Sequence, residues 1–242
     1  MNNVLAYLDS ILFGALPYAV FLFFFLGTIS RYRSEAFTYS SLSTQFLENR
    51  SHFWGSVPLH FGVLTVLAGH IVAFMIPRQV LLWNSKPLRL YILEISALIF
   101  GILAVVGFVS AALRRYADVK VRVVTSLLDW VIYGLLILQA VSGVYIAIFH
   151  PWGSSWFAVS ISPYLWSLVK FNPDITYLAM MPHVVKLHIV CFYLLIGLFP
   201  FSRLVHILVV PNPYLWRKPQ VVRWHGKRRA LAGEEARRGV LP

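Results

Sequence analysis

The sequence predicts an all-α, polytopic membrane protein with five transmembrane helices. Of its 242 residues, 59% are apolar and only 12% are charged, and the mean hydropathy is +0.71. A soluble domain usually has about 25% charged residues. Five apolar segments also approach the roughly 20 residues that a helix needs to cross the hydrocarbon core of a bilayer. This composition leaves little room for a soluble domain.

The five expected spans follow one another through short connections. The stretch before the first span has no basic residue and no small-residue cleavage site follows, which indicates an uncleaved helix rather than a signal peptide. The third and fourth spans carry Glu94 and Asp129 near their entrances. The fifth span is expected to continue past His206 to Val210, where the sequence PNP ends it. The spans are Ile11–Ile29, Val57–Ile76, Tyr91–Leu113, Leu127–Phe149 and Val184–Val210.

The distribution of positive charge predicts the orientation. Most of the 21 Lys and Arg residues lie between spans one and two, between spans three and four, or in the C-terminal tail. Because cytoplasmic connections carry the excess of Lys and Arg, the N-terminus is expected in the periplasm and the C-terminus in the cytoplasm. The protein would then be a multi-pass protein of the inner (cytoplasmic) membrane. Residues 1–223 would form the membrane domain and residues 224–242 a basic cytoplasmic tail.

The formal net charge of +12 favours lipid headgroups or a soluble partner subunit, and not nucleic acid, as the acidic partner of the basic side chains. The long connection between spans four and five is rich in indole and phenol rings, which prefer the headgroup layer. We expect it to lie along the outer membrane surface. Its aromatic residues are Trp152, Trp156, Tyr164, Trp166 and Tyr177.

Four histidines lie within spans: His60 and His70 in the second, His188 and His206 in the fifth. A neutral imidazole is cheaper to insert than a charged side chain and keeps a lone pair for a metal. These two helices should run antiparallel. His60 is therefore expected at the same depth in the membrane as His206, and His70 at the same depth as His188. Two pairs at two depths are what two bis-histidine haems require. The alternative is four histidines that form ordinary interhelical hydrogen bonds.

The spacing permits stacked haems without demanding them. His60 and His70 are ten residues apart, a rise of about 15 Å, and His188 and His206 are eighteen apart, about 27 Å in a straight helix. Eighteen residues are five whole turns, which would leave both histidines on one face, although Pro200 can kink the helix between them. His183 is a rival of His188 as a ligand.

Small residues near the histidines have two readings. Gly62, Gly69 and Gly197 would admit a flat macrocycle between the helices. Membrane helices also use glycine for ordinary close packing.

Several motifs resemble the gamma subunit of respiratory nitrate reductase, a membrane diheme cytochrome b. They are FPFSRLVH ending at His206, the following VPNPYLWRKPQVVR, RYR after the first span, STQFL at Ser43–Leu47 and LLILQAVSG at Leu135–Gly143. The resemblance covers Pro17–Arg223. It implies a membrane anchor that oxidises quinol and passes electrons to an iron–sulfur beta subunit, while nitrate is reduced on a molybdenum-containing alpha subunit.

The resemblance also implies cofactors and ligands. His60 and His206 would hold the inner haem b, and His70 and His188 the outer haem b. Arg203, three residues before His206, could pair with a haem propionate through its guanidinium fork.

Quinol, the substrate, would be oxidised beside the outer haem, near Gly69 and His70. The family uses a basic residue after the second span to assist quinol binding, and Lys86 and Arg89 compete for that role here.

Two other functions fit the same residues. The chain could serve a related sulfur- or formate-linked respiratory complex, since a diheme fold does not specify its partner. A non-redox membrane protein with structural histidines is the third hypothesis, and it predicts a colourless protein.

Overall fold

The computed structural model describes residues 7–35, 38 and 52–209, and within these ranges the chain forms helices and turns and no strand. Five helices are long and apolar enough to cross a membrane: Tyr7–Ser34, Gly55–Met75, Pro87–Ala117, Leu127–Phe149 and His183–Phe201. The five predicted spans and the all-α class are therefore confirmed. The STQFL motif, the segment after Val209 and the basic tail lie outside the described residues.

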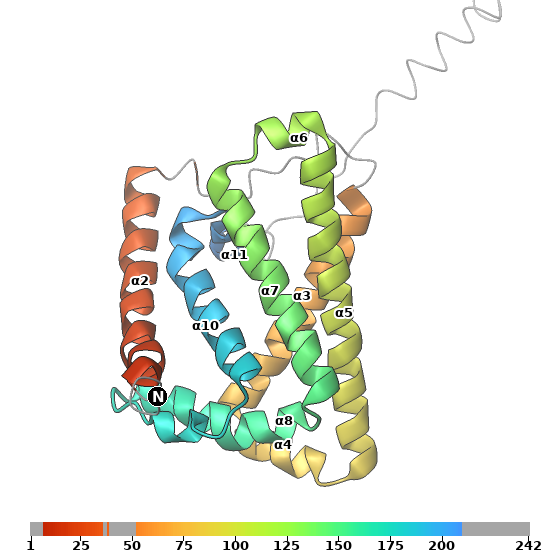
Figure 1. Ribbon diagram of the computed structural model, residues 1–242, viewed down its shortest axis with the longest axis vertical. Helices are drawn as coiled ribbons and strands as arrows, with labels where there is room; N and C mark the ends of the chain where they lie inside the picture. The colour runs from red at the N-terminus through yellow and green to blue at the C-terminus, as the bar shows by residue number, and fades with distance from the viewer. Residues whose placement is uncertain (1–6, 36–37, 39–51, 210–242) are drawn as a thin grey trace, which may run out of the picture. The chain divides into compact units, whose positions relative to one another are not determined.

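The elements follow in the order π-helix η1, α2 to α9 with π-helix η3 between α8 and α9, 3-10 helix η4, α10, 3-10 helices η5 and η6, and α11 (Figure 1). Their bounds are η1 Ser10–Ala15, α2 Leu16–Ser34, α3 His52–Met75, α4 Pro77–Asn84, α5 Pro87–Ala117, α6 Val119–Val123, α7 Leu127–Phe149, α8 Gly153–Trp156, η3 Phe157–Ile161, α9 Ser162–Val169, η4 Ile175–Leu178, α10 His183–Leu198, η5 Phe199–Phe201, η6 Arg203–Val205 and α11 His206–Val209.

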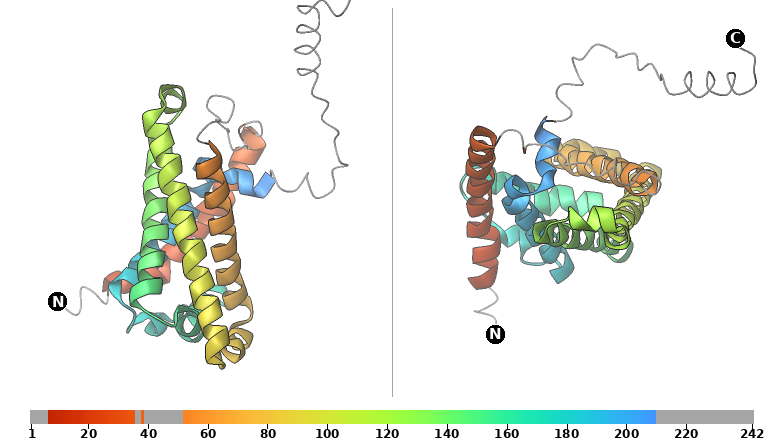
Figure 2. Two further views of the ribbon diagram at one scale, coloured as in Figure 1. Left: turned by 90° about the vertical axis from the view of Figure 1, so that its right-hand side faces the viewer. Right: turned by 90° about the horizontal axis from the view of Figure 1, so that it is seen from above.

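The long helices pack in a series that differs from their order in the chain. α3 packs on α5, α5 on α7, α7 on α10, and α10 on α2 (Figures 1 and 2). Consecutive spans alternate in direction, so α3 and α10 run antiparallel (Figure 1). This is the arrangement that pairing their histidines requires.

Local chemistry explains where two of these helices begin. α5 starts with Pro87, whose fixed φ and missing N–H suit the first turn of a helix. α7 starts with a capping box, in which the Ser126 hydroxyl accepts a bond from the Asp129 N–H (3.1 Å) and the Asp129 carboxylate accepts one from the Ser126 N–H (2.9 Å). Both starts lie close to the predicted ones.

The fifth span is not one uninterrupted helix, which corrects the expectation that it continues to Val210. α10 ends at Leu198 and two 3-10 turns follow, separated by Ser202 in an extended conformation (φ −99°, ψ 177°). Pro200 lacks the N–H that a continuing α-helix needs. The five-turn argument that placed His188 and His206 on one face therefore does not apply.

Glycines bring α3 and α5 into backbone contact. A Cβ built on Gly62 would lie 2.5 Å from the Ala104 backbone nitrogen, and one on Gly107 would overlap the Leu59 backbone nitrogen. Gly62 therefore serves close helix packing rather than space for a macrocycle. Gly69, by contrast, has no atom within 4 Å of its Cβ position.

The connection between α7 and α10 packs onto the end of α3. The Ser162 hydroxyl donates to the Ala73 carbonyl (2.9 Å), and the Trp166 indole N–H donates to the Phe74 carbonyl (3.1 Å). Both acceptors belong to the last turn of α3, where carbonyls have no partner within the helix. α9 thus satisfies the end of α3.

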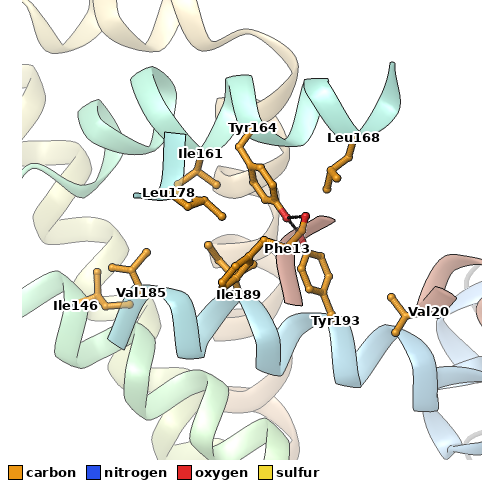
Figure 3. Close-up of a cluster of buried hydrophobic side chains, with 10 residues drawn as sticks. All are labelled: Phe13, Val20, Ile146, Ile161, Tyr164, Leu168, Leu178, Val185, Ile189 and Tyr193. Atoms are coloured by element: carbon orange, nitrogen blue, oxygen red, sulfur yellow. Dashed lines mark hydrogen bonds between the residues drawn. The ribbon is translucent and has the colours of Figure 1, made fainter. Parts of the chain in front are cut away.

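Tyr164 of α9 is fully buried, which corrects its expected place in the headgroup layer. Its hydroxyl donates to the Phe13 carbonyl (2.8 Å) and therefore accepts from the Tyr193 hydroxyl (2.8 Å), so that α9, η1 and α10 are joined (Figure 3). Burial raises the pKa of Tyr164 to about 12, so the phenol stays protonated and keeps donating throughout the neutral range.

Tyr164→Phe is expected to destabilise the protein by about 1–3 kcal/mol, because it leaves the Phe13 carbonyl and the Tyr193 hydroxyl without this partner. Tyr193→Phe should cost less, since the bond from Tyr164 to Phe13 survives. Thermal unfolding of the purified protein in detergent measures both. Tyr177→Phe, at a residue that is 41% exposed, is the control. A larger loss for Tyr193→Phe than for Tyr164→Phe would contradict the proposed direction of the bonds.

Candidate functional site: the intramembrane histidines

His70 of α3 and His188 of α10 lie against each other. Their ring centroids are 6.5 Å apart and their ring planes are inclined by 29°. A metal-bound imidazole nitrogen lies about 2 Å from its metal, so two imidazoles on opposite sides of one metal have centroids roughly 6 Å apart. The observed separation would therefore allow both histidines to bind one metal ion.

Hydrogen bonds fix the tautomer of three histidines. His60, His70 and His206 each have Nδ1 at 2.7–2.8 Å from a main-chain carbonyl three or four residues earlier. A carbonyl only accepts, so Nδ1 carries the proton and the lone pair is on Nε2. All three rings are thus in the form that binds a metal through Nε2.

His188 reaches the same tautomer through side chains of α7. The Ser142 hydroxyl donates to the Gln139 carbonyl (3.1 Å), so it accepts from His188 Nδ1–H (2.9 Å). On the other side of the ring, the Gln139 amide donates to the Nε2 lone pair (3.0 Å). A Cβ at Gly143 would lie 3.1 Å from His188 Cε1, so a glycine there lets the ring rest on α7.

The surroundings of His188 and His70 fit residues that would hold a haem. A metal bound at His188 Nε2 would replace the Gln139 side-chain donor, and the side-chain oxygen of Gln139, Oε1, is already buried without a hydrogen-bond partner among the described residues. The open space at Gly69 adjoins His70. Within the described ranges no group of three or more His, Cys, Asp or Glu side chains converges. The imidazole nitrogens of His70 and His188 are therefore the metal-binding atoms that the described residues bring together here.

The other histidine candidates are placed less closely. Among the described residues His60 and His206 make no ring contact with each other. His60 lies in the first half of α3 and His206 is the first residue of α11, which follows the end of α10. The start of α3 and the end of α10 lie toward the same end of the bundle (Figure 1). His183 is the first residue of α10, and the ring against His70 is that of His188. Phe157 of η3 packs edge-on against His70, at 5.3 Å and 90°.

Arg203 is paired with a carboxylate of the protein itself. Its guanidinium donates to both oxygens of Asp129 (2.8 and 2.9 Å) and to the Val124 carbonyl (2.7 Å). Sequence reasoning noted Asp129 but missed this partner. The fork geometry is the one expected for an anion, while a role toward a haem propionate stays a prediction.

Arg31 stabilises the interruption of the fifth span. It donates to the carbonyls of Pro200 (2.6 Å) and Ser202 (2.9 Å), the first in η5 and the second at the break between η5 and η6. The cation of the first span thus holds the segment that leads to His206.

The two cations proposed for quinol binding lie at the turn between α4 and α5. Lys86 is the residue immediately before α5, and the Arg89 guanidinium sits 5.2 Å from the centroid of the Trp83 ring. Neither makes a hydrogen bond or ion pair with His70 among the described contacts. Their role therefore stays a prediction, as does that of Gly69.

Together, fold and site define a class: a helical protein with five candidate membrane spans, in which a histidine of one span and a histidine of an antiparallel span lie ring to ring. A sequence profile of the family described as nitrate reductase gamma subunit matches residues 9–225. The chain belongs to this family.

Named relatives agree with this assignment. The chain is 34% identical over 217 residues to the nitrate reductase gamma chain of Bacillus subtilis (strain 168), covering 88% of this chain and 97% of the relative. It is 28% and 29% identical to the respiratory nitrate reductase 2 and 1 gamma chains of Escherichia coli (strain K12), covering 91% and 90% of this chain and 99% and 98% of those relatives. The protein is thus a membrane subunit of a respiratory oxidoreductase complex.

Proposed function

We propose that the chain is the quinol-oxidising diheme cytochrome b that anchors a respiratory nitrate reductase in the inner membrane. His70 and His188 hold the outer haem b, and His60 and His206 hold the inner haem b. The observation that carries this proposal is the contact of His70 with His188, with each ring in the Nε2-binding tautomer. The nitrate reductase names of the relatives favour this complex over a sulfur- or formate-linked one.

Bound haem supplies one-electron transfer between a two-electron quinol and a one-electron iron–sulfur acceptor. The chain would position the haems and exclude water from the path between them. α3, α10 and the start of α11 would hold ligands at two depths, and the apolar spans of α3 and α10 would keep the path between them inside the bilayer. Moving an electron inward against the membrane potential costs about 2.3 kcal/mol per 100 mV, which quinol oxidation must supply.

The ends of the helices would meet the reaction partners. Quinol binds near Gly69 and His70, with Arg89 or Lys86 as the assisting cation. The end that carries His206 faces the cytoplasm and contacts an iron–sulfur beta subunit, and nitrate is reduced on a molybdenum-containing alpha subunit.

Haem quantification and a reduced-minus-oxidised visible spectrum of the purified complex test the proposal. We expect two haem b per chain. His70→Ala and His188→Ala should each remove the same haem, because each deletes one ligand of one pair. His183→Ala is the matched control in the same helix and should keep both haems. Fewer than two haems in the unmodified protein, or a haem lost with His183, would sink the assignment.

Neutralising the quinol-site cation is expected to slow quinol oxidation while both haems remain bound. Arg89→Gln and Lys86→Gln, assayed with a soluble quinol and an artificial electron acceptor, identify which cation acts. If either variant loses haem instead, that residue is structural.

A further inference from the structure

The two histidines that face each other at 6.5 Å are held by different chemistry. His70 donates its Nδ1–H to a carbonyl of its own helix (2.8 Å), an acceptor that no side-chain substitution removes. His188 donates to the hydroxyl of Ser142 on a neighbouring helix (2.9 Å). Among the four candidate ligands, His188 is therefore the one whose Nδ1–H donates to a side chain, which a substitution can remove; the other three donate to main-chain carbonyls.

The Ser142 hydroxyl has a fixed direction. Its residue is 5% exposed, and its proton is committed to the Gln139 carbonyl (3.1 Å), so its lone pairs face the His188 ring. Within an apolar span there is little water to substitute for this acceptor. Loss of the hydroxyl would leave Nδ1 without this partner and would free the ring to change tautomer or orientation.

We propose that Ser142 is a positioning residue for His188, which fixes the metal-binding tautomer and sets how strongly this imidazole donates to iron. The proposal rests on the function proposed above, since it assumes that His188 holds the outer haem. A hydrogen-bond acceptor at Nδ1–H raises the basicity of a ligating imidazole and thereby favours the oxidised metal. Ser142 thus lowers the midpoint potential of the outer haem without affecting that of the inner haem.

An ordinary interhelical hydrogen bond would have the same geometry but would behave differently. It would change the stability of the α7–α10 contact and leave the redox potential of a bound haem unaltered. The midpoint potential of the outer haem therefore separates the two roles.

The test uses three variants of the whole complex. Ser142→Ala removes the acceptor, and Ser142→Thr keeps the hydroxyl. Ser96→Ala is the matched control, because the Ser96 hydroxyl also bonds the carbonyl three residues earlier (2.9 Å) and has no histidine partner. Each is analysed by haem quantification, potentiometric titration and the ferric electron paramagnetic resonance spectrum. The outer haem is identified as the one that His70→Ala removes.

With Ser142→Ala we expect a higher midpoint potential and an altered ferric spectrum of the outer haem, with the inner haem unchanged. Ser142→Thr should restore the wild-type values, and Ser96→Ala should reproduce them. If Ser142→Ala loses the outer haem altogether, its retention by Ser142→Thr supports the proposal.

Two results would overturn it. One is an outer-haem potential in Ser142→Ala equal to that of the wild type. The other is the same change, or the same loss of haem, in the Ala and Thr variants. Both leave the diheme function standing if the wild type binds two haems, whereas a wild type without haem would refute that function itself.

Discussion

Asp129→Ala is expected to destabilise the protein by about 3–5 kcal/mol, because it leaves the Arg203 guanidinium buried without its carboxylate. The side chains of Arg203 and Asp129 are 20% and 10% exposed, so water compensates little. Unfolding in mixed detergent micelles, followed by circular dichroism, measures the loss. The Asp129 carboxylate also accepts a bond from the Ser126 main-chain N–H at the start of α7. Ser126→Ala removes the other bond of this capping box, should cost about 1 kcal/mol, and gives the scale of one capping bond.

The double variant Asp129→Ala/Arg203→Met should be more stable than Asp129→Ala, because it also removes the cation whose carboxylate has been deleted. The ion pair of Lys186 with Asp9 is the control. The Asp9 side chain is 32% exposed, so Asp9→Ala should cost about 1 kcal/mol or less. A double variant no more stable than the single one would mean that the two side chains are not coupled.

Gly107→Ala is expected to destabilise the contact between α3 and α5 by about 1–3 kcal/mol, because the added methyl group meets backbone that cannot rotate away. The atom in its way is the Leu59 backbone nitrogen, next to His60. A shift of α3 would also move His70, so we expect reduced haem content together with the loss of stability.

Gly134→Ala is the matched control for this substitution. It makes the same change inside a span, at a position whose Cβ would meet no atom within 4 Å. We expect unchanged haem content and unchanged or slightly higher stability, since alanine favours helix over glycine. Equal effects of the two substitutions would show that close packing at Gly107 does not matter.

Sequence alone predicted the features that depend on local composition and on the alternating direction of successive spans. Hydropathy located the five spans, because each had to satisfy its backbone within an apolar segment. Antiparallel directions of the second and fifth spans were enough to pair His70 with His188, and the structure brings these two rings together.

The remaining features depend on partners far away in the chain. Asp129 meets Arg203 74 residues later, and hydropathy carries no information about that match. Gln139 and Ser142, three residues apart in an apolar helix, were the available signal for polar contacts to His188, but only the fold shows which histidine they face. The 3-10 turns after Leu198 likewise have a partner far away in the chain, because Arg31 donates to the carbonyls of Pro200 and Ser202.

The hydrogen bonds between α9 and its neighbours restrict the amino-acid sequence of α9 more than that of η1 and α3. Ser162, Tyr164 and Trp166 supply side-chain donors, whereas the acceptors on η1 and α3 are main-chain carbonyls. A carbonyl is present whatever side chain its residue carries. Across natural variants, the three donor positions should therefore change rarely, while the acceptor positions vary within the limits of apolar packing.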